Sequence, residues 1–560
     1  MKKIVKNISM LFLATGILSS CYKDLGNYDY TTLNDLEVTD LNSRYEVDQD
    51  EFLVITPQLK GTQYQDTSLF TYQWEISRNI VYNYKDLNLK VGIGIGEHLG
   101  RFMVTEKKNG AKAFFNFTLR VSSTTAGDLI LVLSKQDGHA ELSYKRLDKE
   151  SDFVTNYYEQ RHEEVLGVDP MGIYMNYNFF ANHVPFGFPA TRGGLQVLFK
   201  DQWKILNKNE MGPNKEVSVI NGATFASFVP PYPIPDISNF KPEFINYQVD
   251  MWNFNPYGGI NQSGKLLMIS SGALYTDVMN SYGKTVYINQ KPEDNGYLSP
   301  ALCYAYVRND PQNSAALKMK GYQVGSYVLL FDQVNGRFMY SNSGSAPRKI
   351  QTKELVEYLP LFKGYKMIYA THTANSNKCV AVLSNGEHSK LVYLHVPSDA
   401  ASQLLTPFAI EGEVNVSLDL INANTKFYNM RYTPYILFNT NDKLYRYNAL
   451  NILSKQQPDQ VIANLSSMGY GADASIKTFT VSRTEKNILL AVSRYGQDTN
   501  GAGKTLKGDV VKLLFNSSSI EAQLDKKFEA VSGVPVDIQI KYQNFLRDGL
   551  DKDDKLVDKI

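Results

Sequence analysis

The sequence lacks the residue patterns that the common enzyme classes need. It contains no Gly-x-Ser-x-Gly stretch, and Leu166 stands four residues after His162, where a zincin has its second histidine. Its 7 histidines and 3 cysteines show no zinc-ligand spacing. Two glycine-rich stretches, 92–100 and 501–505, miss the spacing of phosphate-binding loops and precede no helical pattern. We therefore predict no catalytic residues, no metal and no cofactor, although two carboxylates brought together by the fold could still form a glycosidase site.

The sequence also lacks an excess of charge and any long apolar run. Lysine and arginine number 58 against 57 aspartate and glutamate, so there is no electrostatic basis for binding nucleic acid, and none is predicted as a partner. No stretch reaches the roughly 18 apolar residues of a membrane-spanning helix. The hydrophobic content of 43% is that of a globular protein, and 560 residues predict two or three domains. Because helical periodicity is scarce, we expect a mainly β fold.

Two of the three cysteines, Cys303 and Cys379, lie beside apolar residues. These apolar neighbours predict that both cysteines are buried free thiols. A disulfide between them remains possible in an oxidising compartment.

The N-terminus carries the pattern of a bacterial lipoprotein signal. A basic start is followed by an apolar run to Leu18, and the stretch ends on Ser19, Ser20 and Cys21. We predict a signal peptide over 1–20 and lipidation of Cys21, which would attach the protein to a membrane through its N-terminal lipid. An ordinary secretory signal with an incidental cysteine is the alternative. Residues 21–35 are polar and are expected to form a tether.

Residues 36–124 have the pattern of a small β-sandwich. Short alternating segments recur with polar turns between them, and Asn109-Gly110 is a typical hairpin turn. Trp74 lies in the middle of one predicted strand, so we expect its ring to fill the core between the two sheets.

Four stretches in this part of the chain resemble the PKD-like family lipoproteins of Bacteroidota. They are CYKDLGNYDY (21–30), VITPQL (54–59), YQWEI (72–76) and FTLRVSSTTAGDLILVLSK (117–135). The resemblance implies a PKD/Ig-like sandwich followed by a long β region. It also implies a place in the outer membrane, facing the cell exterior, beside a SusC/SusD-like transporter complex. No Phe-Gly-Asp-Gly follows Trp74, so the resemblance implies no shared ligand.

Residues 127–546 contain seven copies of one pattern, in which an apolar strand is followed by a polar turn and a second strand. The copies begin near residues 127, 193, 264, 325, 366, 434 and 487. This repeat predicts a seven-bladed β-propeller, with the apolar runs as inner strands and the segment 534–543 pairing with the first copy. The alternative is an elongated stack of sandwiches. The charged tail 547–560 is expected to fray.

Two aromatic stretches, 174–190 and 228–259, interrupt the repeat. Proline-stiffened aromatic loops on a rigid scaffold are common ligand sites, and aromatic rings stack on sugars or grip peptides. The predicted ligand-binding residues are Tyr232, Tyr247, Trp252, Phe254 and Tyr257. The alternative is that these side chains pack against the propeller.

Together these features predict an outer-membrane, surface-exposed lipoprotein that binds nutrients, either an oligosaccharide or a peptide, as an accessory to a SusC/SusD-like uptake system. Two alternatives remain open: a surface hydrolase of glycans or peptides, and a purely structural subunit of the transporter.

Overall fold

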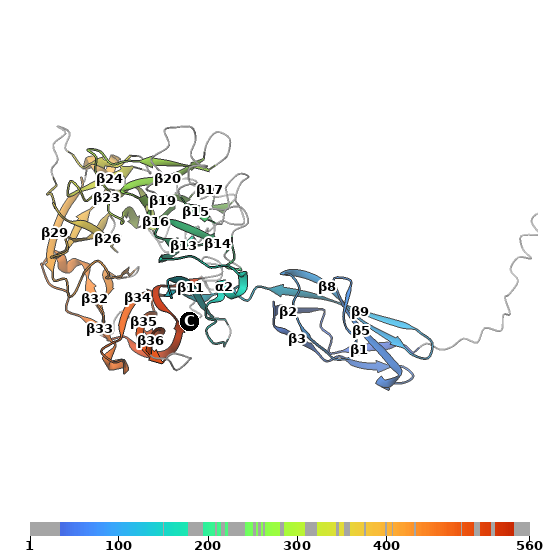
Figure 1. The fold of residues 1–560 in the computed structure, drawn as a ribbon. Helices are drawn as coiled ribbons and strands as arrows, with labels where there is room; N and C mark the ends of the chain where they lie inside the picture. The colour runs from blue at the N-terminus through green and yellow to red at the C-terminus, as the bar shows by residue number, and fades with distance from the viewer. Residues whose placement is uncertain are drawn as a thin grey trace, which may run out of the picture. The chain divides into compact units, whose positions relative to one another are not determined.

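Figure 1 shows the computed structural model of the chain, in which strands predominate. The structure describes residues 34–148, 150–176, 194–207, 210–213, 219–221, 241–249, 254–255, 259–260, 264–279, 285–308, 322–342, 346–351, 359–373, 377–397, 400–405, 407–430, 433–482, 484–497, 504–516 and 521–541. The chain divides into two compact units, Met1–Thr124 and Thr125–Ile560. Among the described residues, no helix is long and apolar enough to cross a membrane.

The first unit is a sandwich of one large sheet and smaller strand pairs. The large sheet has the order β2-β9-β8-β5-β6, formed by Arg44–Asp48, Lys112–Ser122, Gly96–Glu106, Phe70–Ile76 and Asn79–Tyr82. The pairs are β1 (Leu36–Thr39) with β4 (Gln58–Gly61), and β3 (Phe52–Ile55) with β7 (Leu87–Lys90). Residues 67–69 form the 3-10 turn η1 (Thr67–Leu69). Side chains of β3 and β7 share one core with those of β5, β8 and β9, as a sandwich requires.

Trp74 fills the centre of this core, as the sequence predicts. Its side chain is fully buried, and its ring stacks on Phe102 with the centroids 4.3 Å apart and meets the edge of Phe117. The indole Nε1 donates to the carbonyl oxygens of Tyr84 (2.9 Å) and Lys85 (3.2 Å). The ring therefore joins the sheets by packing and fixes the 84–85 loop by hydrogen bonding.

Replacing Trp74 by alanine is expected to lower the free energy of unfolding of the first unit by about 3–5 kcal/mol, because it leaves a large cavity. Peptide-resolved hydrogen exchange under increasing urea would measure this loss in β5, β8 and β9. Leu99→Ala is the matched control, since Leu99 is 79% exposed on β8 and its loss should cost less than about 0.5 kcal/mol. A Trp74 variant as stable as this control would contradict the assignment of the core.

Apart from one two-stranded pair, the second unit contains seven described sheets. Six are four-stranded antiparallel meanders: β12-β13-β14-β15 (Pro170–Asn176, Gly194–Phe199, Gln202–Leu206, Val219–Asn221), β16-β19-β20-β21 (Pro242–Val249, Gly264–Ser270, Ala273–Met279, Thr285–Gln290), β22-β23-β24-β25 (Cys303–Arg308, Tyr322–Asp332, Arg337–Asn342, Arg348–Lys349), β26-β27-β28-β29 (Lys366–His372, Lys378–Ser384, Ser389–His395, Ala409–Val416), β30-β31-β32-β33 (Phe427–Asn429, Tyr435–Asn439, Lys443–Asn448, Val461–Asn464) and β34-β35-β36-β37 (Ser475–Val481, Asn487–Gln497, Lys504–Leu514, Gln523–Ser532).

The remaining sheet combines the beginning and the end of the unit. Its order is β11-β10-β38, formed by His139–Arg146, Leu129–Gln136 and Val534–Lys541. Two shorter elements link successive sheets: α2 (Tyr157–His162) and η6 (Ser466–Met468). Others lie between strands of one sheet: α4 (Ala400–Leu405), η5 (Ala449–Ile452) and the pair β17 (Phe254–Asn255) with β18 (Gly259–Ile260).

These sheets form a seven-bladed β-propeller, following one another around a ring in Figure 1. Apolar clusters lie between successive sheets, and one of them joins the sheet of β34–β37 to the sheet of β10 and β38. The ring is closed by β38, whose Ile538 and Ile540 lie opposite Val132 and Ile130 of β10. The prediction that the last strand pairs with the first copy is confirmed.

The prediction that the apolar runs are inner strands is wrong. The runs LILVL, YVLLF and ILLAV lie in β10, β23 and β35, each the second strand of its sheet. The first strands lie at the centre, where β38 neighbours both β34 and β12, and Figure 1 shows β26 and β34 facing the middle of the ring. The second strand is the more apolar because neighbouring sheets cover both its faces, whereas the central strand also carries polar residues such as Asp537 and Gln539.

Cys303 and Cys379 are both buried thiols, as predicted, and no disulfide joins them. They belong to the same apolar cluster between two sheets, and burial raises the pKa of the Cys303 thiol well above its ordinary value.

Candidate functional site

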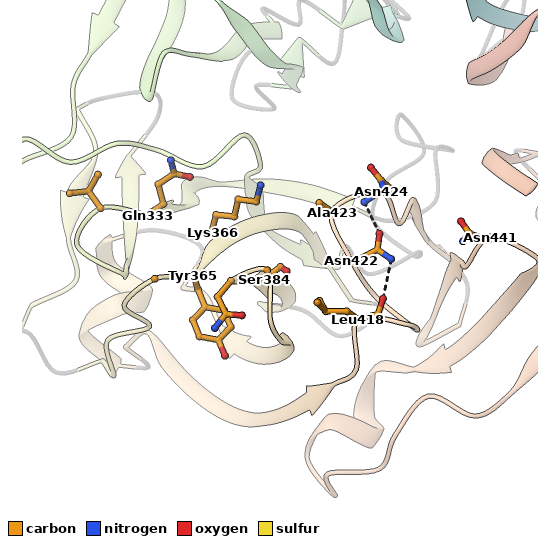
Figure 2. A pocket seen from close by; sticks show the side chains of 13 residues that line it. Gln333, Tyr365, Lys366, Ser384, Leu418, Asn422, Ala423, Asn424 and Asn441 are labelled. Atoms are coloured by element: carbon orange, nitrogen blue, oxygen red, sulfur yellow. Dashed lines mark hydrogen bonds between the residues drawn. The ribbon is translucent and has the colours of Figure 1, made fainter.

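A pocket of about 670 Å³ opens at one end of three consecutive sheets. In an antiparallel meander, the turn between the second and third strands lies at the same end as the link from the fourth strand to the next sheet. The pocket is lined by such turns after β23, β27 and β31, and by the links that precede β26 and β30. Figure 2 shows these segments converging around it. Its volume lies within the range of small-molecule sites. We call it the amide pocket, because Gln333, Asn385, Asn422, Asn424 and Asn441 all line it.

The first turn is held by Asp332, the last residue of β23. Its fully buried carboxylate accepts hydrogen bonds at Oδ1 from the backbone N–H groups of Tyr297 (3.0 Å), Val334 (3.1 Å) and Asn335 (3.3 Å). Oδ2 accepts from Asn335 Nδ2 at 2.6 Å. These bonds fix the backbone of Gln333 and Val334, the two residues of the turn that line the pocket.

A buried serine positions the side chain of Gln333. Ser299 Oγ accepts a hydrogen bond from the backbone N–H of Met367 (3.0 Å) and donates one to Gln333 Oε1 (3.4 Å). The carbonyl oxygen of this amide is therefore occupied, and its Nε2 is left to donate to a ligand.

The second turn is an Asx turn. Asn385 Oδ1 accepts hydrogen bonds from the backbone N–H groups of Glu387 (2.9 Å) and His388 (2.7 Å). Gly386 takes a φ of 87°, which favours glycine at this position. The turn thus uses the oxygen of Asn385, a residue that lines the pocket, and its amide nitrogen makes no hydrogen bond within the described chain.

The link before β30 is organised by Asn422. Its Nδ2 donates to the carbonyl oxygen of Leu418 (3.0 Å), and its Oδ1 accepts from the backbone N–H of Asn424 (2.9 Å), as the dashed lines in Figure 2 show. Both ends of this amide are occupied, so Asn422 shapes the pocket wall. It is not a free ligand-binding group.

Other lining groups have no partner within the part of the chain that the structure describes. Asn424 and Asn441 are exposed, and their side-chain amides make no hydrogen bond there. Ser384 is only 3% exposed, yet its hydroxyl also lacks a described partner while its residue lines the pocket. The Ser384 hydroxyl is not among the buried polar atoms without a partner, so water reaches it at the pocket, where a ligand group could take the place of that water.

The lining residues carry little chemistry besides hydrogen bonding. No carboxylate, histidine or cysteine is among them, and Lys366 is the one charged side chain. Across the described residues, no group of three or more histidine, cysteine, aspartate or glutamate side chains could hold a metal ion. The arrangement is that of a recognition site for a polar molecule.

The residues predicted from the sequence are not the ones that form this pocket. Cys21, Tyr232, Trp252 and Tyr257 lie outside the described residues. Tyr247 and Phe254 lie in β16 and β17, where the backbone is described but their side chains are not. Lipidation at Cys21 and ligand binding at the five aromatic residues therefore stay predictions.

The amide pocket gives almost no signal in the sequence. Asparagine is common in turns because its side chain bonds to the nearby backbone, as Asn385 and Asn422 do. The free amides of Asn424 and Asn441 look the same in the sequence, and only the fold brings turns of three sheets together.

Comparisons with known proteins identify one domain. The chain carries a PKD-like family domain, whose model matches residues 21–170. No curated protein matches the chain. Among solved structures, a quinonprotein alcohol dehydrogenase-like protein from Bacteroides thetaiotaomicron is 12% identical, with a TM-score of 0.42, and covers 90% of this chain and 97% of its own. The β-propeller domain of Nup133 from Vanderwaltozyma polyspora is 9% identical, with a TM-score of 0.30, and covers 70% of this chain and 87% of its own.

Proposed function

We propose that this protein is a lipid-anchored, surface-exposed protein of the outer membrane that binds oligosaccharides in the amide pocket, as an accessory to a SusC/SusD-like uptake system. The observation that carries the binding function is the set of unpartnered hydrogen-bonding groups on Ser384, Asn424 and Asn441.

The chemistry of these groups favours a sugar over a peptide. A sugar hydroxyl both donates and accepts, and an amide side chain offers two donors and an acceptor with two lone pairs. Tyr365 adds a partly exposed ring at the wall, which could stack on a sugar face. A peptide ligand would instead be expected to place apolar side chains in the pocket, where only Val334, Leu418 and Ala423 could receive them.

The proposed location at the outer membrane is supported by the N-terminal residues, not by the amide pocket. The leader 1–20 and Cys21 have the lipoprotein pattern, and the PKD-like domain begins at residue 21, where the mature chain would start. The association with a SusC/SusD-like transporter comes from the resemblance to family lipoproteins alone.

The test is isothermal titration calorimetry against a panel of neutral and acidic oligosaccharides and of peptides. The Asn424→Ala/Asn441→Ala variant is expected to bind the selected oligosaccharide about tenfold more weakly or worse, since each lost hydrogen bond costs about 0.5–1.5 kcal/mol. Both side chains are exposed and lack described partners, so the free energy of unfolding should not change.

Asn116→Ala is the matched control, because Asn116 is an exposed asparagine on β9 of the first unit. It should bind like the unaltered protein. If the double variant bound equally well and Trp252→Ala abolished binding, the site would belong to the predicted aromatic segment instead. Binding of peptides alone would refute the proposed ligand class.

A further inference from the structure

The amide pocket contains one cation without a counter-ion. Lys366, the first residue of β26, lines the pocket and is exposed, and no ion pair or hydrogen bond involves its side chain within the described chain. Nearby carboxylates on Glu387, Asp419 and Asp442 are exposed and do not line the pocket. The positive charge is therefore not neutralised by the pocket wall.

Lys366 lies directly opposite Ser384 in the pairing of β26 with β27. Side chains that are directly opposite in an antiparallel pair emerge on the same face, with their Cβ atoms about 4.5–5.5 Å apart. The unpartnered hydroxyl of Ser384 and the ammonium of Lys366 both belong to the pocket lining. Figure 2 shows the two residues on neighbouring strands at the pocket wall. A single acidic group could accept a hydrogen bond from each.

We propose that the amide pocket selects acidic oligosaccharides, with the carboxylate of a uronic acid residue bound between Lys366 Nζ and Ser384 Oγ. This inference rests on the proposed function, and it names the class of sugar. The amides of Asn424 and Asn441 bind the hydroxyl groups, which all sugars have, whereas Lys366 and Ser384 distinguish a charged sugar from a neutral one.

The charge has a measurable consequence for binding. An ion pair at a pocket mouth is partly screened by water and salt, so we expect a preference of about tenfold for the acidic ligand at low ionic strength. The preference should shrink as sodium chloride is raised, because the Debye length falls from about 10 Å at 0.1 M to about 3 Å at 1 M. Binding of a neutral ligand should not depend on salt.

The test uses pairs of oligosaccharides that differ in charge alone. Uronic acid oligomers and the same oligomers with methyl-esterified carboxyl groups are titrated into the full-length protein by calorimetry, at low and high salt. The unaltered protein is expected to bind the acid form about tenfold more tightly than the ester. Lys366→Gln keeps a polar side chain without charge, so it should bind both forms with the affinity of the ester.

Lys363→Gln is the matched control. Lys363 is an exposed lysine in the link that precedes β26, three residues before Lys366, and it does not line the pocket. This variant should keep the full preference. Ser384→Ala should weaken the acid form more than the ester, since its hydroxyl is assigned to the carboxylate. A sulfated oligosaccharide and its desulfated counterpart form a second arm, in which a preference for the sulfated form alone would overturn the assignment to uronic acids.

The outcomes separate this inference from the proposed function. Equal binding of the acid and ester forms, unchanged in Lys366→Gln, would overturn the selectivity and leave oligosaccharide binding intact. A preference lost equally in Lys363→Gln and Lys366→Gln would assign it to general surface charge and overturn the role of Lys366. Failure of every oligosaccharide to bind would overturn the proposed function itself.

Discussion

Replacing Ile538 by aspartate is expected to unfold the propeller. Ile538 is fully buried on β38, in the cluster that joins the last sheet to the first, and it lies opposite Val132 of β10. The variant loses about 1.5–3 kcal/mol of apolar burial and also places a carboxylate where no partner can reach it, which costs several kcal/mol more. Together these losses approach the 5–15 kcal/mol that typically stabilises a folded domain.

The expected result is loss of hydrogen-exchange protection throughout the described sheets of residues 125–541, while the core around Trp74 stays protected. Leu524→Asp is the matched control, because Leu524 lies on β37 and is 45% exposed. It introduces the same charge and should cost less than about 0.5 kcal/mol. If both variants had the same stability, β38 would not be what closes the ring.

Replacing Asp332 by alanine is expected to have the second largest effect. It removes the acceptor for the backbone N–H groups of Tyr297, Val334 and Asn335. It also removes one of the two carboxylates beside Arg337, which keeps its ion pair with Asp294 at 3.0 Å. Each buried donor left without its acceptor costs about 1–3 kcal/mol. The turn after β23 should then lose its fixed shape, so oligosaccharide affinity should fall together with the free energy of unfolding.

Urea unfolding and calorimetric titration of the same preparation would measure both effects. Asp442→Ala is the matched control, since Asp442 occupies the corresponding turn after β31 but has a half-exposed side chain. Its loss should change stability by less than about 1 kcal/mol. A variant of Asp332 that lost stability but kept full affinity would show that the turn does not position the ligand.

The fold was largely predictable from the sequence because burial leaves a regular pattern. Alternation identified most strands around Trp74, and seven apolar runs marked seven sheets. The burial of β2 also alternates, but three of its five residues are charged, so its sequence does not stand out as a strand. The sequence could not predict which strand of each sheet lies at the centre of the ring. An apolar run indicates that a strand is covered on both faces, but it does not indicate which strands lie beside it.

The amide pocket could not be predicted for a different reason. A turn asparagine can satisfy its own backbone, as Asn422 does, or leave its amide free, as Asn424 does two residues later. Whether an asparagine amide bonds to the nearby backbone or stays free depends on distances within the folded link. Lys366 and Ser384 likewise become neighbours only through the register of β26 with β27. Such relations are set by pairing between strands, which one sequence does not contain.

Because β38 closes the ring, the propeller can complete its fold only after the end of the chain has been synthesised. Val132 and Ile538 pair across about 400 residues, so bringing them together requires closing a long loop. At about 5–20 residues synthesised per second, β10 waits roughly 20–80 s for its partner. During that time its apolar edge is unpaired, and exposed edges of this kind seed aggregation. The sandwich needs no later strand, whereas the propeller cannot close until its last strand has been synthesised.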